Sequence, residues 1–185
     1  MFMKHKSILI GPMVIALVSV CCFQPALAAE KETKASETKS EKGGSLSSAD
    51  KKFAENAAKG GMMEVAWGRE AASKAQNNDV KQFGNRMVTD HSKANSELKS
   101  IASKKGISLS SKEPGANFKT DKAYMDMMVS DHQKDLAEFQ QEAKNGSDAD
   151  LKAFADKTSK VVASHLSEAR RIDKNLKHEA SSLAR

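Results

Sequence analysis

Apolar residues recur along the chain at alternating spacings of three and four, in four stretches separated by polar or glycine-containing segments. That spacing places the apolar positions on one face of an α-helix. No stretch alternates with a period of two, as a half-buried strand would, and no proline interrupts the four stretches. The pattern predicts an all-α fold, with helices at about residues 48–76, 79–105 and 118–144 and a fourth from about residue 148.

Two of the three predicted connections are tight turns, and the middle one is longer. The first lies at Asn77-Asn78, the last at Asn145-Gly146-Ser147, and residues 106–117 between them contain Pro114-Gly115. Tight connections join antiparallel neighbours, so the sequence predicts two helical hairpins that form an antiparallel four-helix bundle. The longer connection fits either a crossover, as in ferritin-like bundles, or a simple up-down order, and the sequence does not choose between them.

The first 28 residues have the composition of a cleaved secretory signal peptide. A short basic start precedes an apolar run from Ile8 to Val20, and Ala26-Leu27-Ala28 has the small-residue pattern of a cleavage site. The apolar run is short for a bilayer span, although an uncleaved membrane anchor is the alternative. The pattern predicts export to the periplasm or cell envelope, with no transmembrane segment after cleavage.

Residues 29–46 are rich in Glu, Lys, Ser and Thr and are predicted to be a disordered linker to a single domain at residues 47–185. Both cysteines, Cys21 and Cys22, lie inside the predicted signal. Cleavage would leave no cysteine, which excludes disulfides and thiolate chemistry in the mature chain. Lipidation at Cys21 or Cys22 is an alternative, but Val20 is not the small residue that usually precedes an acylated cysteine.

The formal charge of +6 falls by two, to +4, when Lys4 and Lys6 leave with the signal. Acidic and basic residues are interspersed, as on a solvated surface, and form no basic stripe for nucleic acid. We therefore expect no nucleic-acid partner. Weak association with anionic envelope surfaces is compatible with the charge, and the oligomeric state is not encoded in the pattern.

One titratable residue interrupts each predicted apolar face near mid-helix: Glu64, His91, His132 and His165. Burying such groups is costly unless they are satisfied. Counted from the middle of the first turn, Glu64 and His91 are each about 13 residues away and should be level. His132 lies about 15 residues before Ser147 and His165 about 18 after it. The difference of about three residues corresponds to roughly one turn of helix. His165 is therefore the least securely placed of the four.

A five-residue segment recurs around two of the histidines. Met87-Val88-Thr89-Asp90-His91 is repeated as Met128-Val129-Ser130-Asp131-His132, and Val161 to His165 is a degenerate third copy. In each full copy the methionine lies four residues before the histidine, on the same helical face. The aspartate points about 100° away, so Asp90 and Asp131 are predicted to support ligands from the outer shell, with Met87 and Met128 beside them.

Three imidazoles and one carboxylate suit Zn, Fe, Mn or Cu better than Ca or Mg. The sequence therefore predicts a transition-metal site formed by Glu64, His91, His132 and His165. One alternative is a polar network in which these residues hydrogen-bond one another and the methionines fill gaps in the core. Another is coincidence, with one or more of the four rotated to the surface.

From about Phe53 to Ile172 the chain resembles an exported bacterial family named for its domain of unknown function, number 4142. The resemblance is carried by Glu64-Val65, the two Met-Val-(Thr/Ser)-Asp-His segments and His165. It implies a ferritin-like fold and an extracytoplasmic setting, and it implies no activity. Di-iron proteins of that fold use Glu-x-x-His on two helices, whereas Val88 and Val162 stand three residues before His91 and His165. The departure favours a mononuclear or vestigial site.

Two hypotheses for function follow. In the first, the protein is an exported metal-binding bundle that acts in metal handling or stress protection. In the second, it is a non-enzymatic envelope or stress protein whose polar layer is purely structural. A hydrolase is disfavoured, because no nucleophile elbow or Gly-rich phosphate loop is present, and the sequence favours a protein without catalytic activity.

Overall fold

The computed structural model describes residues 46–112 and 114–183, which form four α-helices and, within these ranges, no strand. The helices are α1 (Ser48–Lys74), α2 (Asn78–Lys104), α3 (Asp121–Asn145) and α4 (Ala149–Leu183). The predicted all-α fold is confirmed. The predicted signal peptide, both cysteines and all of the predicted linker except Leu46 lie outside the described residues.

Side-chain caps set most helix starts. Asn77 accepts hydrogen bonds from the backbone N–H groups of the first turn of α2, and Asp148 does the same for α4. The third helix begins three residues later than the predicted Phe118, because the Thr120 side chain accepts a hydrogen bond from Ala123 N–H at 3.1 Å. Phe118 instead packs against the core beside Tyr124.

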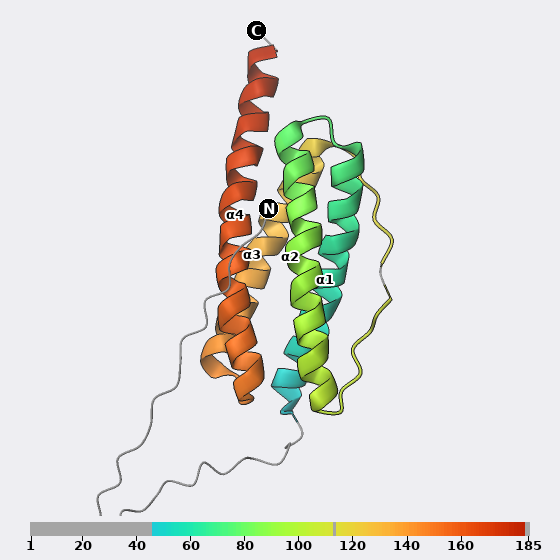
Figure 1. The fold of residues 1–185 in the computed structure, drawn as a ribbon. Coiled ribbons are helices and arrows are strands. Elements are labelled where there is room, and N and C mark those ends of the chain that lie inside the picture. Colours follow the sequence, from blue (N-terminus) through green and yellow to red (C-terminus); the bar gives the residue numbers. More distant parts are fainter. Residues whose placement is uncertain (1–45, 113, 184–185) are drawn as a thin grey trace, which may run out of the picture. The chain divides into compact units, whose positions relative to one another are not determined.

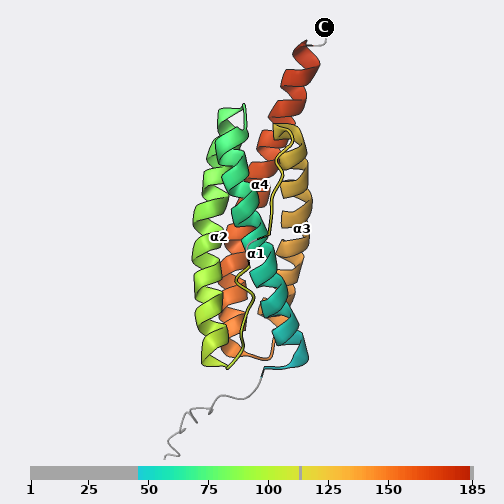
Figure 2. The same cartoon turned by 90° about the vertical axis from the view of Figure 1, so that its right-hand side faces the viewer.

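The helices are connected in an up-down-down-up order (Figures 1 and 2). The α1–α2 and α3–α4 hairpins pack together so that α2 lies beside α4 and α1 beside α3. At one end, Asp121 at the start of α3 accepts hydrogen bonds from the Gln76 and Asn77 N–H groups in the α1–α2 turn. At the other, Lys105 after α2 pairs with Asp148 before α4 at 2.6 Å. All neighbouring helices are thus antiparallel.

The connection from α2 to α3 is therefore a crossover along the whole bundle, of the kind that ferritin-like folds use. It leaves α2 through a glycine turn: Gly106 has a φ of 70°, and Ile107 N–H donates to Ala102 O at 2.9 Å. Leu109 then packs against the core at one end of the bundle and Phe118 at the other. Because the α2–α3 connection is anchored at both ends of the bundle, α3 must begin at the end opposite to the one where α2 ends.

The apolar core is divided into two clusters. The lower cluster joins the start of α1 to the end of α2 and the start of α4, with Phe53, Leu98 and Phe154 among its buried residues. The upper cluster joins the other halves of the helices and includes Phe83 and Ile172. On each helix, the predicted titratable residue lies between the segments that supply the two clusters. The polar layer thus lies at mid-height, with apolar packing on both sides.

Two glycines let α1 and α2 approach closely just above this layer. A Cβ atom placed on Gly68 would lie 2.7 Å from the Gly84 carbonyl oxygen, and the reverse substitution gives the same separation. Real Cβ atoms do not approach that closely, so any side chain would push the helices apart. The close contact holds α1 and α2 in the register that brings Glu64 beside His91.

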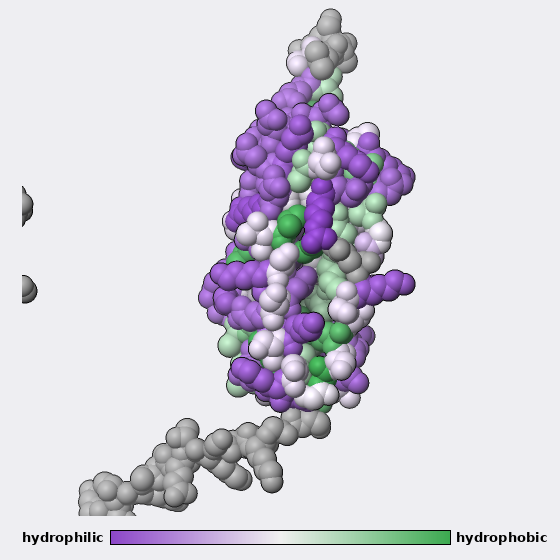
Figure 3. Space-filling model, turned by 45° about the vertical axis from the view of Figure 1, so that its right-hand side comes forward, coloured by the Kyte–Doolittle hydropathy of each residue, from purple (hydrophilic) through white to green (hydrophobic). Residues whose placement is uncertain are grey.

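The surface is mainly hydrophilic. On the face drawn in Figure 3, strongly hydrophobic areas are small and separate from one another, and Met63 is the single large hydrophobic residue that is exposed among those described. Within the described part of the chain, we find no helix with both the length and the apolar character needed to cross a membrane.

Candidate functional site

The four predicted core residues do meet, and all four are buried. His132 and His165 have no exposed surface, and His91 and Glu64 are 6% and 5% exposed. The three imidazole rings are packed against one another, with centroids 5.3–5.7 Å apart. One nitrogen from each ring lies within 4.8 Å of the corresponding nitrogens of the other two. Each helix therefore contributes one side chain to a single layer.

The His132 ring is oriented by its own helix. Its Nδ1 lies 3.0 Å from the Met128 carbonyl oxygen, one turn earlier in α3. A carbonyl can only accept, so Nδ1 carries the proton and the neutral ring has its lone pair on Nε2. The Glu64 Oε1 atom is also 3.3 Å from Nδ1, but Oε1 makes no hydrogen bond. The bond to Met128 is the one that fixes the tautomer.

The His91 ring is oriented by Glu64, across the α1–α2 contact. Its Nδ1 lies 2.8 Å from Oε2 of the carboxylate, and an ionised carboxylate only accepts. His91 Nδ1 is therefore the donor, and Nε2 has no hydrogen-bond partner. Glu64, predicted as a metal ligand, thus lies where one oxygen orients a histidine and the other remains unpartnered within the layer.

The His165 ring is oriented by Asp90, across the α2–α4 contact. His165 Nε2 lies 2.8 Å from Asp90 Oδ2, so Nε2 donates and Nδ1 retains its lone pair. Arg86 holds the same carboxylate oxygen through Nε at 3.3 Å, and its terminal nitrogens reach Glu168 and Ser164 on α4. Asp90 therefore orients the His165 ring from α2.

The result is three buried ring nitrogens without a hydrogen-bond partner: His91 Nε2, His132 Nε2 and His165 Nδ1. In each ring the other nitrogen donates to a carboxylate or carbonyl, the arrangement that orients histidine ligands in metalloproteins. Ligands of a tetrahedral ion at about 2.0–2.1 Å would lie about 3.3 Å apart. One nitrogen from each ring lies within 4.8 Å of a nitrogen of each of the other two, which is at most about 1.5 Å longer than that separation.

The electrostatics of the layer favour neutral rings at two of the three histidines. Burial lowers the pKa of His165 to about 4, although the hydrogen bond to Asp90 opposes this, and burial also lowers that of His132. For His91, burial acts in the same direction, but the Glu64 carboxylate outweighs it and raises the pKa. Burial would raise the pKa of Glu64, yet the histidines, His91 foremost, bring it below its ordinary value.

Three of the predicted outer-shell residues lie apart from the converging nitrogens. The side chains of Met87 and Met128 are buried in the upper apolar cluster, as the alternative of core packing proposed, and Met128 contributes only its carbonyl oxygen. Asp131 pairs with Lys134 at 3.6 Å. Although the repeat gives Asp90 and Asp131 the same local sequence, only Asp90 has a histidine of another helix within hydrogen-bond distance.

Sequence reasoning missed three residues near the layer: Asp135, Tyr124 and Arg86. Asp135 lies one turn after His132 on α3, and burial together with the Glu64 charge raises its pKa to about 7; its spacing of three from His132 was the available signal. Tyr124 has a buried hydroxyl with no partner, and burial raises its pKa. Arg86, which holds Asp90, could have been found from its spacing of four before that residue.

Three imidazoles packed together in a buried layer have the donor chemistry of a site for a borderline transition metal. The fit rests on the three orphaned nitrogens, since buried polar atoms are normally satisfied. Glu64 and Asp90 would supply negative charge to the surrounding shell. The layer differs from a di-iron centre, since Val88 and Val162 stand where the Glu of a Glu-x-x-His pair would precede His91 and His165.

Comparison with known proteins agrees with the fold and assigns no chemistry. A family model described as a domain of unknown function (DUF4142) matches residues 35–172. A crystal structure of a protein provisionally assigned as a spore coat protein of Bacillus halodurans superposes with a TM-score of 0.65 at 12% identity, covering 72% of this chain and 91% of that one. At this identity the similarity shows the fold alone. No curated protein sequence matches the chain significantly.

Proposed function

Since the chain belongs to the DUF4142 family, whose description names no activity, we propose a function from the geometry of the core: the protein binds one transition-metal ion. The ligands are His91 Nε2, His132 Nε2 and His165 Nδ1, and Glu64 and Asp90 orient two of the rings. The observation that carries the proposal is a buried layer in which three imidazole rings pack together and each ring has one nitrogen without a hydrogen-bond partner.

A purely structural layer accounts poorly for those nitrogens. Each buried polar atom without a partner costs about 1–3 kcal/mol, and three apolar side chains of similar volume would avoid that cost. A metal ion satisfies all three lone pairs at once. The donor set suits Zn, Cu, Fe or Mn, and the lack of a Glu three residues before His91 and His165 favours a mononuclear centre over a di-iron one.

The test is metal-dependent stabilisation of the full chain, purified after export and stripped with a chelator. We expect one equivalent of one of these ions to bind and to raise the melting temperature, because a ligand that binds only the folded state stabilises it. Replacing His91, His132 and His165 together by Gln should abolish both effects. Replacing the exposed His178 on α4 by Gln is the matched control and should leave both unchanged.

If the wild-type protein is not stabilised by Fe, Zn, Mn or Cu at modest excess, the proposal is wrong. A single His165→Gln variant guards against failure of the triple variant to fold. It should retain the helical spectrum and bind the ion much more weakly.

The second candidate is a structural polar layer in an envelope or stress protein. The hydrogen bond between Glu64 and His91 at 2.8 Å favours it, because that pair is satisfied without a metal. It predicts that the chelated protein has the same melting temperature as the protein supplied with metal.

For the setting, we propose that the protein acts outside the cytoplasm, in the periplasm or cell envelope, in metal handling or protection against stress. The signal-like composition of residues 1–28 supports export. Fractionation of cells that produce the full chain tests this setting: export predicts a protein shortened by about 28 residues in the extracytoplasmic fraction, whereas full-length protein in the cytoplasm would contradict it.

A further inference from the structure

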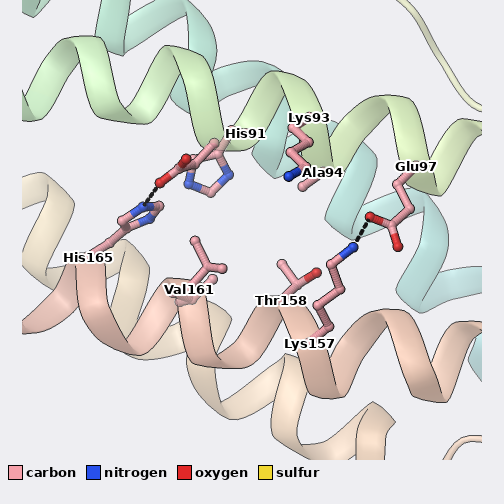
Figure 4. A pocket seen from close by; sticks show the side chains of 10 residues that line it. His91, Lys93, Ala94, Glu97, Lys157, Thr158, Val161 and His165 are labelled. Atoms are coloured by element: carbon pink, nitrogen blue, oxygen red, sulfur yellow. Dashed lines mark hydrogen bonds and ion pairs between the residues drawn. The ribbon is translucent and has the colours of Figure 1, made fainter. Parts of the chain in front are cut away.

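A pocket between α2 and α4 opens toward the histidine layer. Its lining includes His91 and His165 at the inner end, Val161 along the wall, and Lys93, Glu97 and Lys157 toward the outside, and its volume is about 110 Å³. Figure 4 shows His165 at one end of this groove and the ion pair of Glu97 with Lys157 at the other. His165 is hydrogen-bonded there to Asp90.

The pocket reaches a layer that has three candidate ligands. A tetrahedral ion held by three histidines keeps a fourth position for water or an external ligand. The Oδ2 atom of Asp90 accepts from His165 Nε2 and from Arg86, so this carboxylate is held on the side of the His165 ring opposite its free Nδ1. Glu64 approaches the layer from α1, whereas the pocket lies between α2 and α4. The fourth ligand can therefore come from solvent through the pocket.

The opposite side of the layer offers much less space. A second cavity, lined by Glu64, His91 and Asp135, has a volume of about 20 Å³, which is enough for about one water molecule. The pocket between α2 and α4 is more than five times larger by the same measure. A ligand of more than one non-hydrogen atom must therefore use the α2–α4 side.

The outer part of the pocket favours an anion. Two lysines face one carboxylate there: Lys157 pairs with Glu97 at 2.6 Å, and the exposed Lys93 lines the same mouth. At the inner end, Asp90 pairs with Arg86, which also pairs with Glu168 on α4. Farther in, Ala94 and Val162 make the wall apolar, which favours a small ligand with a weakly held hydration shell.

We infer that the pocket between α2 and α4 is the access route to the metal centre, and that it delivers a small monovalent anion of about two or three atoms to the fourth coordination position. The inference rests on the proposed metal site. It adds an exchangeable external ligand, which a buried structural ion would lack.

The experiment uses the full chain loaded with cobalt(II) and titrated with azide. Azide should change the visible d–d spectrum of the cobalt saturably with one-to-one stoichiometry. Val161→Phe, which fills the wall of the pocket, should weaken azide binding about 10-fold or more while the cobalt content stays the same. Ser167→Phe, at an exposed position of α4 outside the pocket, is the matched control and should bind azide like the wild type.

Two further variants test the walls separately. Ala94→Leu narrows the pocket from the α2 side and should act in the same direction as Val161→Phe. Lys93→Gln should weaken azide binding about 2- to 5-fold, the size expected for one exposed charge.

The outcomes separate the two proposals. If cobalt binds but azide leaves its spectrum unchanged, or binds equally to Val161→Phe and Ala94→Leu, the access route is wrong and the metal site stands. If cobalt does not bind in the histidine layer, the metal site and the access route fall together.

Discussion

The two nitrogens of each core imidazole differ in their hydrogen bonding. In all three rings, one nitrogen donates to a fixed acceptor on another helix or in the preceding turn, and the other has no partner. In a self-contained polar network both nitrogens would be used within the layer. The acceptors are Glu64, Asp90 and the Met128 carbonyl, so orientation is supplied by three different elements.

Asp90 should be the most informative of these acceptors to change. Asp90→Asn removes the charge that holds His165 Nε2–H and Arg86, so the affinity for metal should fall about 10- to 100-fold. Isothermal titration of the chelated protein measures the change. Asp131→Asn is the matched control, because Asp131 occupies the same place in the repeat but pairs with Lys134. Equal losses in the two variants would show that Asp90 has no orienting role.

At this scale the sequence predicted the residue types well and their surroundings less well. The interrupted apolar faces identified Glu64 and all three histidines, because a titratable residue on a core face is conspicuous. The repeat predicted equal roles for Asp90 and Asp131, which they do not have. The difference is tertiary: Asp90 faces α4 across the α2–α4 contact, and no local pattern contains that contact.

The relative heights of the layer residues depend on how helices direct their side chains. Glu64 lies 10 residues before the end of α1, and His91 lies 13 after the start of α2. His132 and His165 lie 13 before the end of α3 and 16 after the start of α4. Both pairs are thus offset by three residues. Side chains lean toward the N-terminus of their own helix, so in an antiparallel hairpin this offset brings the tips together.

Counting residues from the turns ignores this lean of the side chains. It therefore placed Glu64 and His91 level and His165 about a turn away. The expectation that His165 is the least secure member was wrong, because its ring lies 5.3 Å from that of His91 and 5.4 Å from that of His132. The presence of the helices was predictable from the apolar periodicity. The relative height of residues on paired helices was not, because it depends on the geometry of the turns between them.

The close contact of α1 with α2 gives a second prediction. Gly68→Ala should destabilise the fold by about 1–3 kcal/mol, because the new Cβ would meet the Gly84 carbonyl at 2.7 Å. Gly60→Ala on the same helix is the control: its Cβ meets nothing within 4 Å, and alanine should stabilise the helix by about 0.5–1 kcal/mol. Urea unfolding of both variants checks this. Similar effects from the two substitutions would contradict the close contact.

A pair of buried carboxyl groups ties α1 to the α3–α4 turn. Asp50 Oδ1 accepts from Ser147 N–H at 2.9 Å. Burial, followed by the neighbouring Asp50 carboxylate, raises the pKa of Glu142 from 4.5 to about 7. Between these two values the folded protein holds a proton that the unfolded chain has released. Stability contributed by this group is therefore full below about pH 4.5 and is lost as the pH rises through about 7.

Glu142→Gln should remove this dependence, since glutamine can donate to Asp50 at every pH. The variant should gain about 2–3 kcal/mol over the wild type at pH 8 and little at pH 4.5. Unfolding by denaturant at the two pH values measures the difference. A constant difference between the two proteins would show that Glu142 titrates normally in the folded state.

For the molecule as a whole, the crossover was the feature that the sequence left open. Its direction follows from contacts between segments far apart in the chain, such as Asp121 with the α1–α2 turn and Lys105 with Asp148. The crossover makes α2 and α4 antiparallel neighbours. That arrangement brings Asp90 to His165 and forms the pocket that reaches the layer. Topology and candidate chemistry therefore depend on the same connection.

The central claim is that one transition-metal ion is held by the three orphaned nitrogens. Anomalous diffraction from crystals of the metal-loaded protein, measured at the absorption edge of the ion, tests it most directly. We expect one peak about 2.0–2.2 Å from His91 Nε2, His132 Nε2 and His165 Nδ1, with Glu64 and Asp90 on the far sides of their histidines. Crystals whose anomalous peaks lie only at surface residues, with the layer free of metal, would contradict it.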